Sequence, residues 1–223
     1  MNKRGVQPTR LLLARHGQTV WHHDNRYAGS SDVELNEAGL REAQALARRA
    51  ERERLDLVVC SPLIRAVETA QPAAEACGVE LVVDERLHEV DFGEWEGKTL
   101  EEVRAADPIA AKRFEADPVK YGFPGGEPLP EAARRALEAL RELDAEHPGE
   151  KVLVVVHNTL IRLVLCSLLG IPLKNYRRRF PNLVNVAITE VRLSEGGGAL
   201  YTFNDAEHLW ELKDATRIEE RRS

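Results

Sequence analysis

Residues 11–17 read Leu11-Leu12-Leu13-Ala14-Arg15-His16-Gly17, a short apolar run that ends in a cation, an imidazole and a glycine. The apolar run predicts a buried strand that starts at Arg10. At the end of such a strand, His16 is a candidate nucleophile and Arg15 a candidate clamp for an anion, so a phosphate is the expected target. Taken alone, the same residues also fit an ordinary polar strand end beside a surface charge. Other motifs in the chain are needed to distinguish this interpretation from a phosphate site.

The length and the charge of the chain limit what it can do. Its 223 residues suffice for one well-packed domain, and its formal net charge of -6 gives no general attraction for nucleic acid. Any anion must therefore be bound by locally placed arginines. We expect a small phosphorylated metabolite as the partner, and no nucleic acid.

Three cysteines, Cys60, Cys77 and Cys166, show no CxxC spacing and lie in apolar or helical contexts. They predict reduced core residues and neither a disulfide framework nor a zinc site. The first apolar stretch follows the polar residues 1–9 and is too short for a signal-peptide core or a membrane span. We therefore expect a cytoplasmic protein with no membrane partner, a disordered N-terminal tail over 1–9 and a charged C-terminal tail over 204–223.

Short apolar runs alternate with longer helical stretches, a pattern typical of an α/β layered fold. Strands are expected at 10–14, 57–60, 80–83, 151–156 and 184–193, the last an antiparallel edge with 199–203 as its hairpin partner. Helices are expected at 36–51, 62–77, 130–146 and 158–169, with Pro62 in the first turn of the second. The segment 88–128 is less regular, and we expect it to cap the site as a lid or insertion.

Four short motifs fall directly after the predicted strands. Arg15-His16-Gly17 follows the first strand, Ser61–Arg65 the second, Glu89 lies beyond the third, and His157 follows the fourth. Because ligands bind outside the carboxyl ends of the strands in parallel sheets, these groups are expected to meet at one edge. Two histidines, two arginines and a carboxylate arriving together are harder to explain by chance than any one of them. The joint pattern predicts an anion site with catalytic groups.

The motifs resemble those of the histidine phosphatase superfamily, in its phosphoglycerate mutase-like branch. The resemblance covers about residues 10–193 and rests on Leu12–Thr19, Ser61–Ala66, Leu87–Glu89, Phe92–Gly97, Val156–His157 and Ile161–Arg162. It implies an α/β fold, a three-layer α/β/α sandwich with a mostly parallel central sheet, in a single domain over 10–203. It also implies that His16 is phosphorylated and then dephosphorylated.

The chemistry of these residue types agrees with the resemblance. An imidazole attacks phosphorus only when the attacking nitrogen is unprotonated, and a carbonyl near Gly17 is expected to hold the other nitrogen of His16. Glu89 is the candidate general acid for the leaving alkoxide and then the base toward water. The alternative for Glu89 is a surface carboxylate in an acidic stretch.

Positively charged and polar groups complete the predicted site. Arg15 and Arg65 are expected to grip the nonbridging phosphate oxygens, and His157 to stabilise the charge that spreads over them. The helix that starts near Asn158 is expected to add backbone donors at the same point. With these cations in place, no metal ion and no cofactor are expected. Gln18, His22 and Asn158 complete the list of substrate-binding candidates.

Three residues depart from the family pattern. His22 stands where the family commonly has an asparagine that touches the phosphate, and Ala28 replaces a polar residue. Asn158 stands where glycine is usual and adds an amide that can bond phosphate or restrain His157. Arg177-Arg178-Arg179 is expected to be a solvated helix end, with attraction of an anionic substrate as the alternative.

The expected activity is hydrolysis of small phosphomonoesters through a phosphohistidine. The nearest alternative is a phosphoglycerate mutase, which must hold a bisphosphate and exclude water, whereas residues 98–128 offer no paired-arginine motif. A third alternative is a phosphate-binding protein with altered catalysis, supported only by positions 22 and 158. The sequence does not identify the phosphate ester. Substrate selection is expected to depend on residues 98–128 and 176–179. The oligomeric state is also open, with a homodimer as one option.

Overall fold

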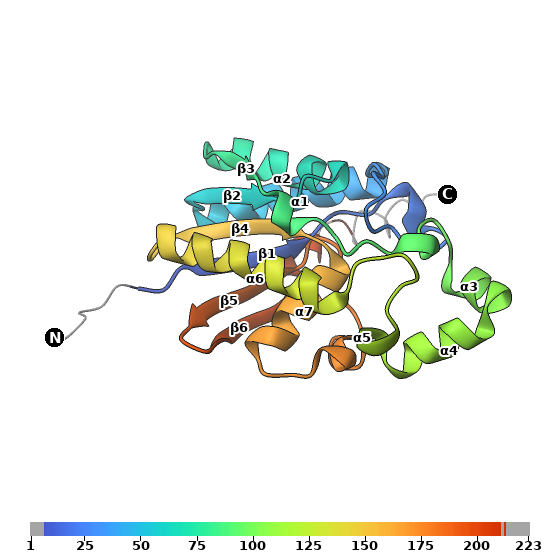
Figure 1. Ribbon diagram of the computed structural model, residues 1–223. Helices are drawn as coiled ribbons and strands as arrows, with labels where there is room; N and C mark the ends of the chain where they lie inside the picture. Colours follow the sequence, from blue (N-terminus) through green and yellow to red (C-terminus); the bar gives the residue numbers. More distant parts are fainter. Residues whose placement is uncertain (1–6, 211, 213–223) are drawn as a thin grey trace.

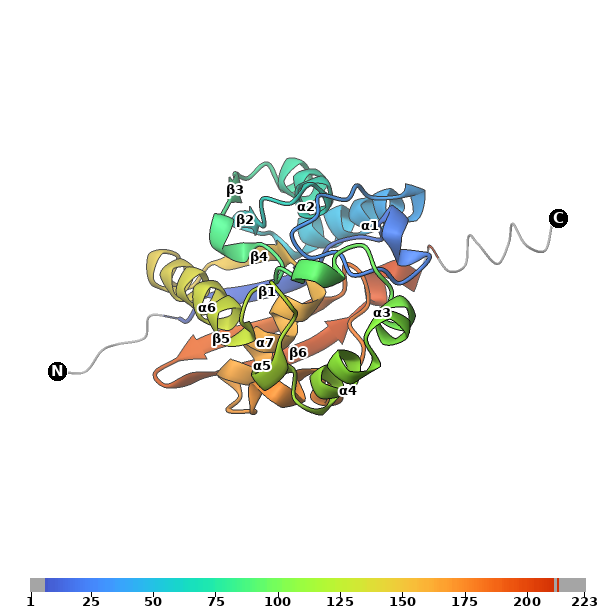
Figure 2. The same ribbon diagram turned by 45° about the vertical axis from the view of Figure 1, so that its right-hand side comes forward.

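A six-stranded sheet forms the centre of the molecule, which the computed structural model describes over residues 7–210 and at residue 212. The strand order is β3-β2-β4-β1-β5-β6 (Figures 1 and 2). The strands are β1 (Arg10–Arg15), β2 (Leu57–Cys60), β3 (Leu81–Val83), β4 (Lys151–Val156), β5 (Ile188–Ser194) and β6 (Gly197–Asp205). The first four run parallel, and β5 and β6 are added antiparallel beside β1.

Helices cover both faces of this sheet (Figure 1). They are α1 (Glu37–Glu53), α2 (Ile64–Cys77), α3 (Leu100–Ala106), α4 (Pro108–Ala116), α5 (Pro118–Tyr121), α6 (Leu129–Glu146), α7 (Asn158–Leu168) and α8 (Tyr176–Arg179). One buried cluster joins α1 and α2 to the sheet, and a second, larger one joins α6 and α7 to the opposite face. The predicted three-layer α/β/α sandwich with a mostly parallel sheet is confirmed.

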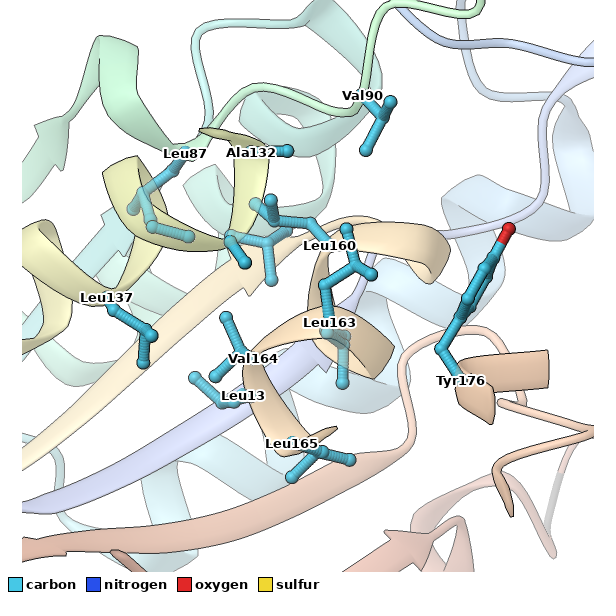
Figure 3. Packing of buried hydrophobic residues seen from close by; sticks show 14 of the residues in the cluster. Leu13, Leu87, Val90, Ala132, Leu137, Leu160, Leu163, Val164, Leu165 and Tyr176 are labelled. Carbon is cyan, nitrogen blue, oxygen red and sulfur yellow. The ribbon is translucent and has the colours of Figure 1, made fainter. Parts of the chain in front are cut away.

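Strand β1 is buried on both faces because its side chains alternate between the two layers. Leu12 and Ala14 pack with α1 and α2, whereas Leu11 and Leu13 belong to the cluster of α6 and α7. Figure 3 shows Leu13 beside Val164 of α7. Truncating such a buried leucine to alanine costs about 2–5 kcal/mol. The apolar run therefore anchors the residues that follow it.

The turn after β1 is pressed against the start of α1. Asn36 caps this helix by accepting a hydrogen bond from the Gly39 backbone N–H at 2.9 Å. A Cβ atom on Gly17 would lie only 2.8 Å from the carbonyl oxygen of Gly39, so this close approach requires glycine. The backbone next to His16 thus has little freedom.

The segment 88–128 is more regular than expected, because it contains α3, α4 and α5. Pro108 and Pro118 occupy first helical positions, where a missing N–H costs nothing. Asp107 and Asp117 cap these two helices. The aromatic residues of the segment pack on one another, with the rings of Phe92 and Phe123 4.6 Å apart.

Several boundaries differ from the sequence expectation. Helix α2 begins at Ile64, after Pro62, because Leu63 is still extended. Strand β5 is not an edge, since β6 covers it. Strand β6 continues to Asp205, and a short 3₁₀ helix (Glu207–Leu209) follows it and packs near α1.

Residues of both expected tails are part of the folded domain. Leu209 is buried, so residues 204–209 belong to the domain and not to a tail. Thr9 is also buried, and its hydroxyl donates to the carbonyl of His147 at 2.8 Å. The rest of the two expected tails, 1–6, 211 and 213–223, lies outside the described residues. No helix within the described part of the chain is long and apolar enough to cross a membrane.

Candidate active site

A pocket of about 230 Å³ opens at the carboxyl end of the parallel strands. It is lined by Arg15, His16, Thr19, His22, Asn25, Arg26, Tyr27, Ala28, Glu89, Phe92, Leu100, Asn158, Thr159, Arg162 and Arg177. Five of the predicted site residues are in this lining, and Phe92 and Leu100 come from the expected lid segment. The volume is below the roughly 300–1,000 Å³ of drug-sized sites, which suits a small ligand.

His16 directly follows β1 and is 5% exposed. Its backbone N–H donates to the Val156 carbonyl at 2.9 Å, which continues the pairing of β1 with β4. The Nδ1 atom lies 2.7 Å from the Gly17 carbonyl oxygen, as predicted. A carbonyl only accepts, so Nδ1 carries the ring proton and Nε2 keeps its lone pair. Burial, followed by the charges of Arg65 and Arg15, lowers the pKa of His16 well below its usual value.

Arg15 is held through two of its guanidinium nitrogens. Its Nη1 donates to the Leu183 carbonyl at 2.8 Å, and its Nη2 lies 2.6 Å from Nε2 of His22. A guanidinium only donates, so His22 Nε2 is the acceptor for Arg15, while Nδ1 lies 2.9 Å from the Thr19 backbone nitrogen and 2.8 Å from the Thr19 hydroxyl. Burial and the Arg15 charge lower the pKa of His22 to about 4, so the ring is neutral. His22 therefore orients Arg15 in this structure.

Glu89 is 3% exposed and accepts three backbone hydrogen bonds. The N–H groups of Val90, Thr159 and Leu160 donate to its carboxylate at 3.0, 2.9 and 3.0 Å. The predicted donors at the start of α7 therefore bond Glu89 rather than facing the pocket. Burial raises the pKa of Glu89 above its usual value despite these bonds, which favour the ionised form.

His157 directly follows β4 and precedes the first residue of α7, and it is fully buried. Its ring centre lies 5.2 Å from that of His16, so the two predicted histidines do meet. Nε2 lies 2.7 Å from the Ser61 hydroxyl, while the buried Nδ1 has no hydrogen-bond partner among the described residues. Burial, followed by the charges of Arg65 and His16, lowers the pKa of His157 well below its usual value.

Arg65 does not line the pocket as the sequence suggested. It is fully buried and donates to the carbonyls of Ser31 and Gly29 at 2.7 Å each. The carboxylate of Glu96 holds the same loop, accepting from the Ser31 hydroxyl at 2.6 Å. Arg65 thus ties this loop to α2 and acts on the histidines through its charge.

Gln18 is also placed away from the pocket. Its side-chain oxygen accepts a hydrogen bond from the Asn36 amide at 2.8 Å, and its backbone N–H donates to Glu42 at 2.7 Å. The side chain therefore supports the start of α1. Asn158 does line the pocket, and its buried Oδ1 has no partner among residues 7–210 and 212.

Two arginines of the pocket wall were not among the predicted site residues, although Arg162 belongs to the motif Ile161–Arg162 that contributed to the resemblance. Arg162 follows Asn158 by four residues, on the same face of α7, so helical spacing could have identified it. Arg177 was expected at a solvated helix end, with attraction of an anionic substrate as the alternative. Instead it is partly buried, and its Nη2 donates to the Tyr27 hydroxyl at 3.2 Å. No local sequence signal brings residue 27 to residue 177.

Comparison with known proteins identifies the family to which the chain belongs. The model of the histidine phosphatase superfamily, branch 1, matches residues 11–206. The chain belongs to this superfamily. Phosphoserine phosphatase 1 of Hydrogenobacter thermophilus is 33% identical over 203 residues, which cover 91% of this chain and 95% of that protein.

Solved structures of other histidine phosphatase superfamily relatives have the same fold. YhfR of Bacillus stearothermophilus superposes with a TM-score of 0.83 at 33% identity, over 90% of this chain and 99% of that one. The mycobacterial glucosyl-3-phosphoglycerate phosphatase Rv2419c, in complex with VO3, has a TM-score of 0.81 at 30% identity, over 88% and 99% of the two chains. The resemblance inferred from the four motifs is confirmed at the level of sequence family and of fold.

Proposed function

We propose that the chain hydrolyses small phosphomonoesters in two steps, through a phosphohistidine formed on His16. The observation that carries this proposal is the orientation of the His16 ring, whose Nδ1 is held by the Gly17 carbonyl while Nε2 stays unprotonated at the pocket. The lowered pKa of His16 keeps this nitrogen available as a nucleophile at neutral pH. The phosphatase names of the relatives described above support hydrolysis over mutase activity.

In the first step, Nε2 of His16 attacks the phosphorus atom, and the bond to the ester oxygen breaks. The leaving alkoxide takes a proton from Glu89, whose raised pKa supports the role of a general acid. In the second step, Glu89 accepts a proton from a water molecule that attacks the phosphohistidine. The nitrogen–phosphorus bond then breaks, which releases inorganic phosphate and restores both groups.

Cations and hydrogen-bond donors stabilise the charge on the transferred phosphoryl group. Arg15 lines the pocket beside His16 and supplies a permanent charge to the nonbridging oxygens. Nε2 of His157 lies 2.7 Å from the Ser61 hydroxyl, and the buried Nδ1 has no partner among the described residues. We assign the ring proton of His157 to Nδ1, so that Ser61 donates to Nε2 and Nδ1 is free to donate to the nonbridging oxygens. The amide of Asn158 is a further donor. The arginines take the charge-stabilising role that metal ions have in other phosphatases.

The test is phosphate release from p-nitrophenyl phosphate with a metal chelator present. His16→Ala should abolish the release, whereas His23→Ala should not, because the His23 side chain is exposed to solvent. Rapid mixing with a labelled ester should trap acid-labile phosphate on the wild-type protein. Full activity of His16→Ala would refute the nucleophile. Labelling without net phosphate release would indicate a mutase. If neither labelling nor phosphate release is observed, a phosphate-binding protein would be indicated.

A further inference from the structure

Glu89 lies in a part of the backbone that no regular element holds. Residues 88–92 form neither helix nor strand and lie between two 3₁₀ helices, Glu85–Leu87 and Gly93–Trp95. Because such a segment has no helical or ladder hydrogen bonds, its backbone carbonyls need partners from elsewhere. Arg135 of α6 provides them, although it is not one of the residues that line the pocket.

The guanidinium of Arg135 binds three backbone carbonyls around Glu89. Its Nη1 donates to the carbonyls of Arg86 and His88 at 2.6 and 2.7 Å, and its Nη2 donates to the carbonyl of Glu89 itself at 3.2 Å. A planar guanidinium points its five N–H donors in fixed directions, so three bonds from one such group define the path of the backbone. Arg135 therefore sets where the main chain of Glu89 lies relative to α6.

Glu127 holds Arg135 in turn. The two carboxylate oxygens of Glu127 accept from Nε and Nη2 of Arg135 at 2.8 Å each, and the two side chains are only 17% and 11% exposed. These two bonds and the three to carbonyls use all five N–H donors of the guanidinium. The backbone N–H of Glu127 also donates to the Asp91 carbonyl at 2.9 Å, so the pair is joined to the chain both before and after residue 89.

The carboxylate end of Glu89 is held by the first turn of α7. The N–H groups in the first turn of a helix have no partner within the helix, and the first bond within α7 is donated by Ile161 at 3.0 Å. Glu89 accepts from the N–H groups of Thr159 and Leu160, which precede it. The backbone of Glu89 is thus fixed by Arg135 and its carboxylate by α7. A misplacement of about 1 Å in a catalytic group can cost about 10²-fold in rate.

We propose that Arg135, held by Glu127, is a positioning residue for Glu89 as the general acid and base. Arg135 does not line the pocket, so its effect on turnover has to pass through Glu89. The inference rests on the proposed function, in which Glu89 protonates the leaving alkoxide. The need for that proton depends on the ester, because an alkoxide is a strong base and a poor leaving group, whereas p-nitrophenolate is a weak base. The effect of losing Arg135 should therefore depend on the leaving group.

Comparing two leaving groups tests this inference. Arg135→Lys keeps a positive charge but loses the planar fork of donors. We expect kcat for an alkyl phosphate to fall by about 10- to 100-fold and kcat for p-nitrophenyl phosphate to fall by less, with KM for both near the wild-type value. The alkyl phosphate is whichever of glycerol 3-phosphate and phosphoserine the wild type hydrolyses faster. An equal loss of kcat for the two esters would overturn the positioning role while leaving the phosphatase proposal intact.

Arg134→Lys is the matched control. Arg134 is the neighbour of Arg135 on α6. It also pairs with two carboxylates, those of Glu131 and Glu138, but its side chain is 58% exposed. The ratio of kcat between the two esters should stay at the wild-type value in this variant. With Glu89→Gln already present, Arg135→Lys should lower kcat by no more than about twofold further, because both changes act on the same step. A full further loss in that double variant would refute the assignment.

Amide hydrogen exchange separates this proposal from the proposed hydrolysis, because it needs no turnover. In Arg135→Lys, the backbone amides of Thr159 and Leu160 should exchange with deuterium about tenfold faster than in the wild type, since their acceptor is displaced. The amide of Leu153 in β4 should keep its wild-type rate. If the wild type hydrolyses no ester but the two amides respond in this way, the proposed hydrolysis fails and the positioning role stands. Unchanged exchange at both amides, or an equal acceleration at Leu153, would refute the positioning role whatever the activity.

Discussion

Two buried neutral histidines should make the stability of this protein fall steeply below neutral pH. His16 and His157 are 5% and 0% exposed, and both have pKa values well below the usual value, with burial as the main cause. In the unfolded chain the same side chains titrate near pH 6.5. The unfolded state therefore takes up protons first as the pH falls, and the stabilisation present above pH 6.5 is lost below it.

The loss in the free energy of unfolding can be estimated from the number of protons that the unfolded chain binds in excess of the folded protein. At pH 5.5, about one unit below the pKa of an unfolded histidine, each buried neutral histidine has lost about 1.4 kcal/mol of its contribution. The two together lower the free energy of unfolding by about 3 kcal/mol relative to pH 7.5. For a protein of this size, that corresponds to a fall in Tm of about 6–12 °C. Glu89 acts in the opposite sense, since its raised pKa favours the folded state at low pH.

Urea unfolding at pH 7.5, 6.5 and 5.5 measures this dependence, and a double variant isolates the two histidines. His16→Asn with His157→Asn removes both titrating groups while other groups, such as His22 and Glu89, stay in both proteins. The wild type should lose about 3 kcal/mol more than the double variant between pH 7.5 and 5.5. The exposed His23→Asn should behave as the wild type. Equal pH dependence in the wild type and the double variant would refute the argument that these rings are buried and neutral.

Three further outcomes are expected. Glu89→Gln should lower kcat by about 10²–10⁴-fold for alkyl phosphates, which need a protonated leaving group, and by less for p-nitrophenyl phosphate. A steady-state comparison of the two ester types checks this. His22→Leu, which removes the acceptor that orients Arg15, should raise KM about tenfold, whereas His22→Asn should keep KM closer to the wild type. Asn36→Ala should cost about 1 kcal/mol in urea unfolding, through loss of the α1 cap at Gly39.

The sheet and the two histidines could be predicted because their signals are local. An unbroken apolar run such as 152–156 is expected to be buried, and a residue that directly follows it must lie at the strand end. The helices of 88–128 could not be predicted in the same way. A proline disrupts a helix when it lies in the interior, but it is favoured at the first helical position, where Pro108 and Pro118 lie. Local composition does not distinguish these cases without the capping geometry of Asp107 and Asp117.

The details of the candidate site depend on partners that lie far away in the sequence. Arg65 was predicted at the right place in the fold, but its guanidinium bonds the carbonyls of the loop near Gly29 instead of facing the pocket. Arg177 was expected in solvent, yet Tyr27 and Phe114 enclose it. The residue type indicates which bonds a side chain can form, but the three-dimensional structure selects among the available partners.

The hydrogen bonds from the start of α7 to Glu89 couple the protonation state of the catalytic carboxyl to the stability of this helix. Whenever Glu89 is protonated, the backbone N–H groups of Thr159 and Leu160 lose an ionised acceptor, so the first turn of this helix is weakened at one stage of each cycle. A directed-evolution search for thermostable variants should accordingly retain glutamate at this position even when activity is not selected. Inactive variants at position 89 are thus poor substrate-trapping reagents, because the helix start is altered together with the chemistry.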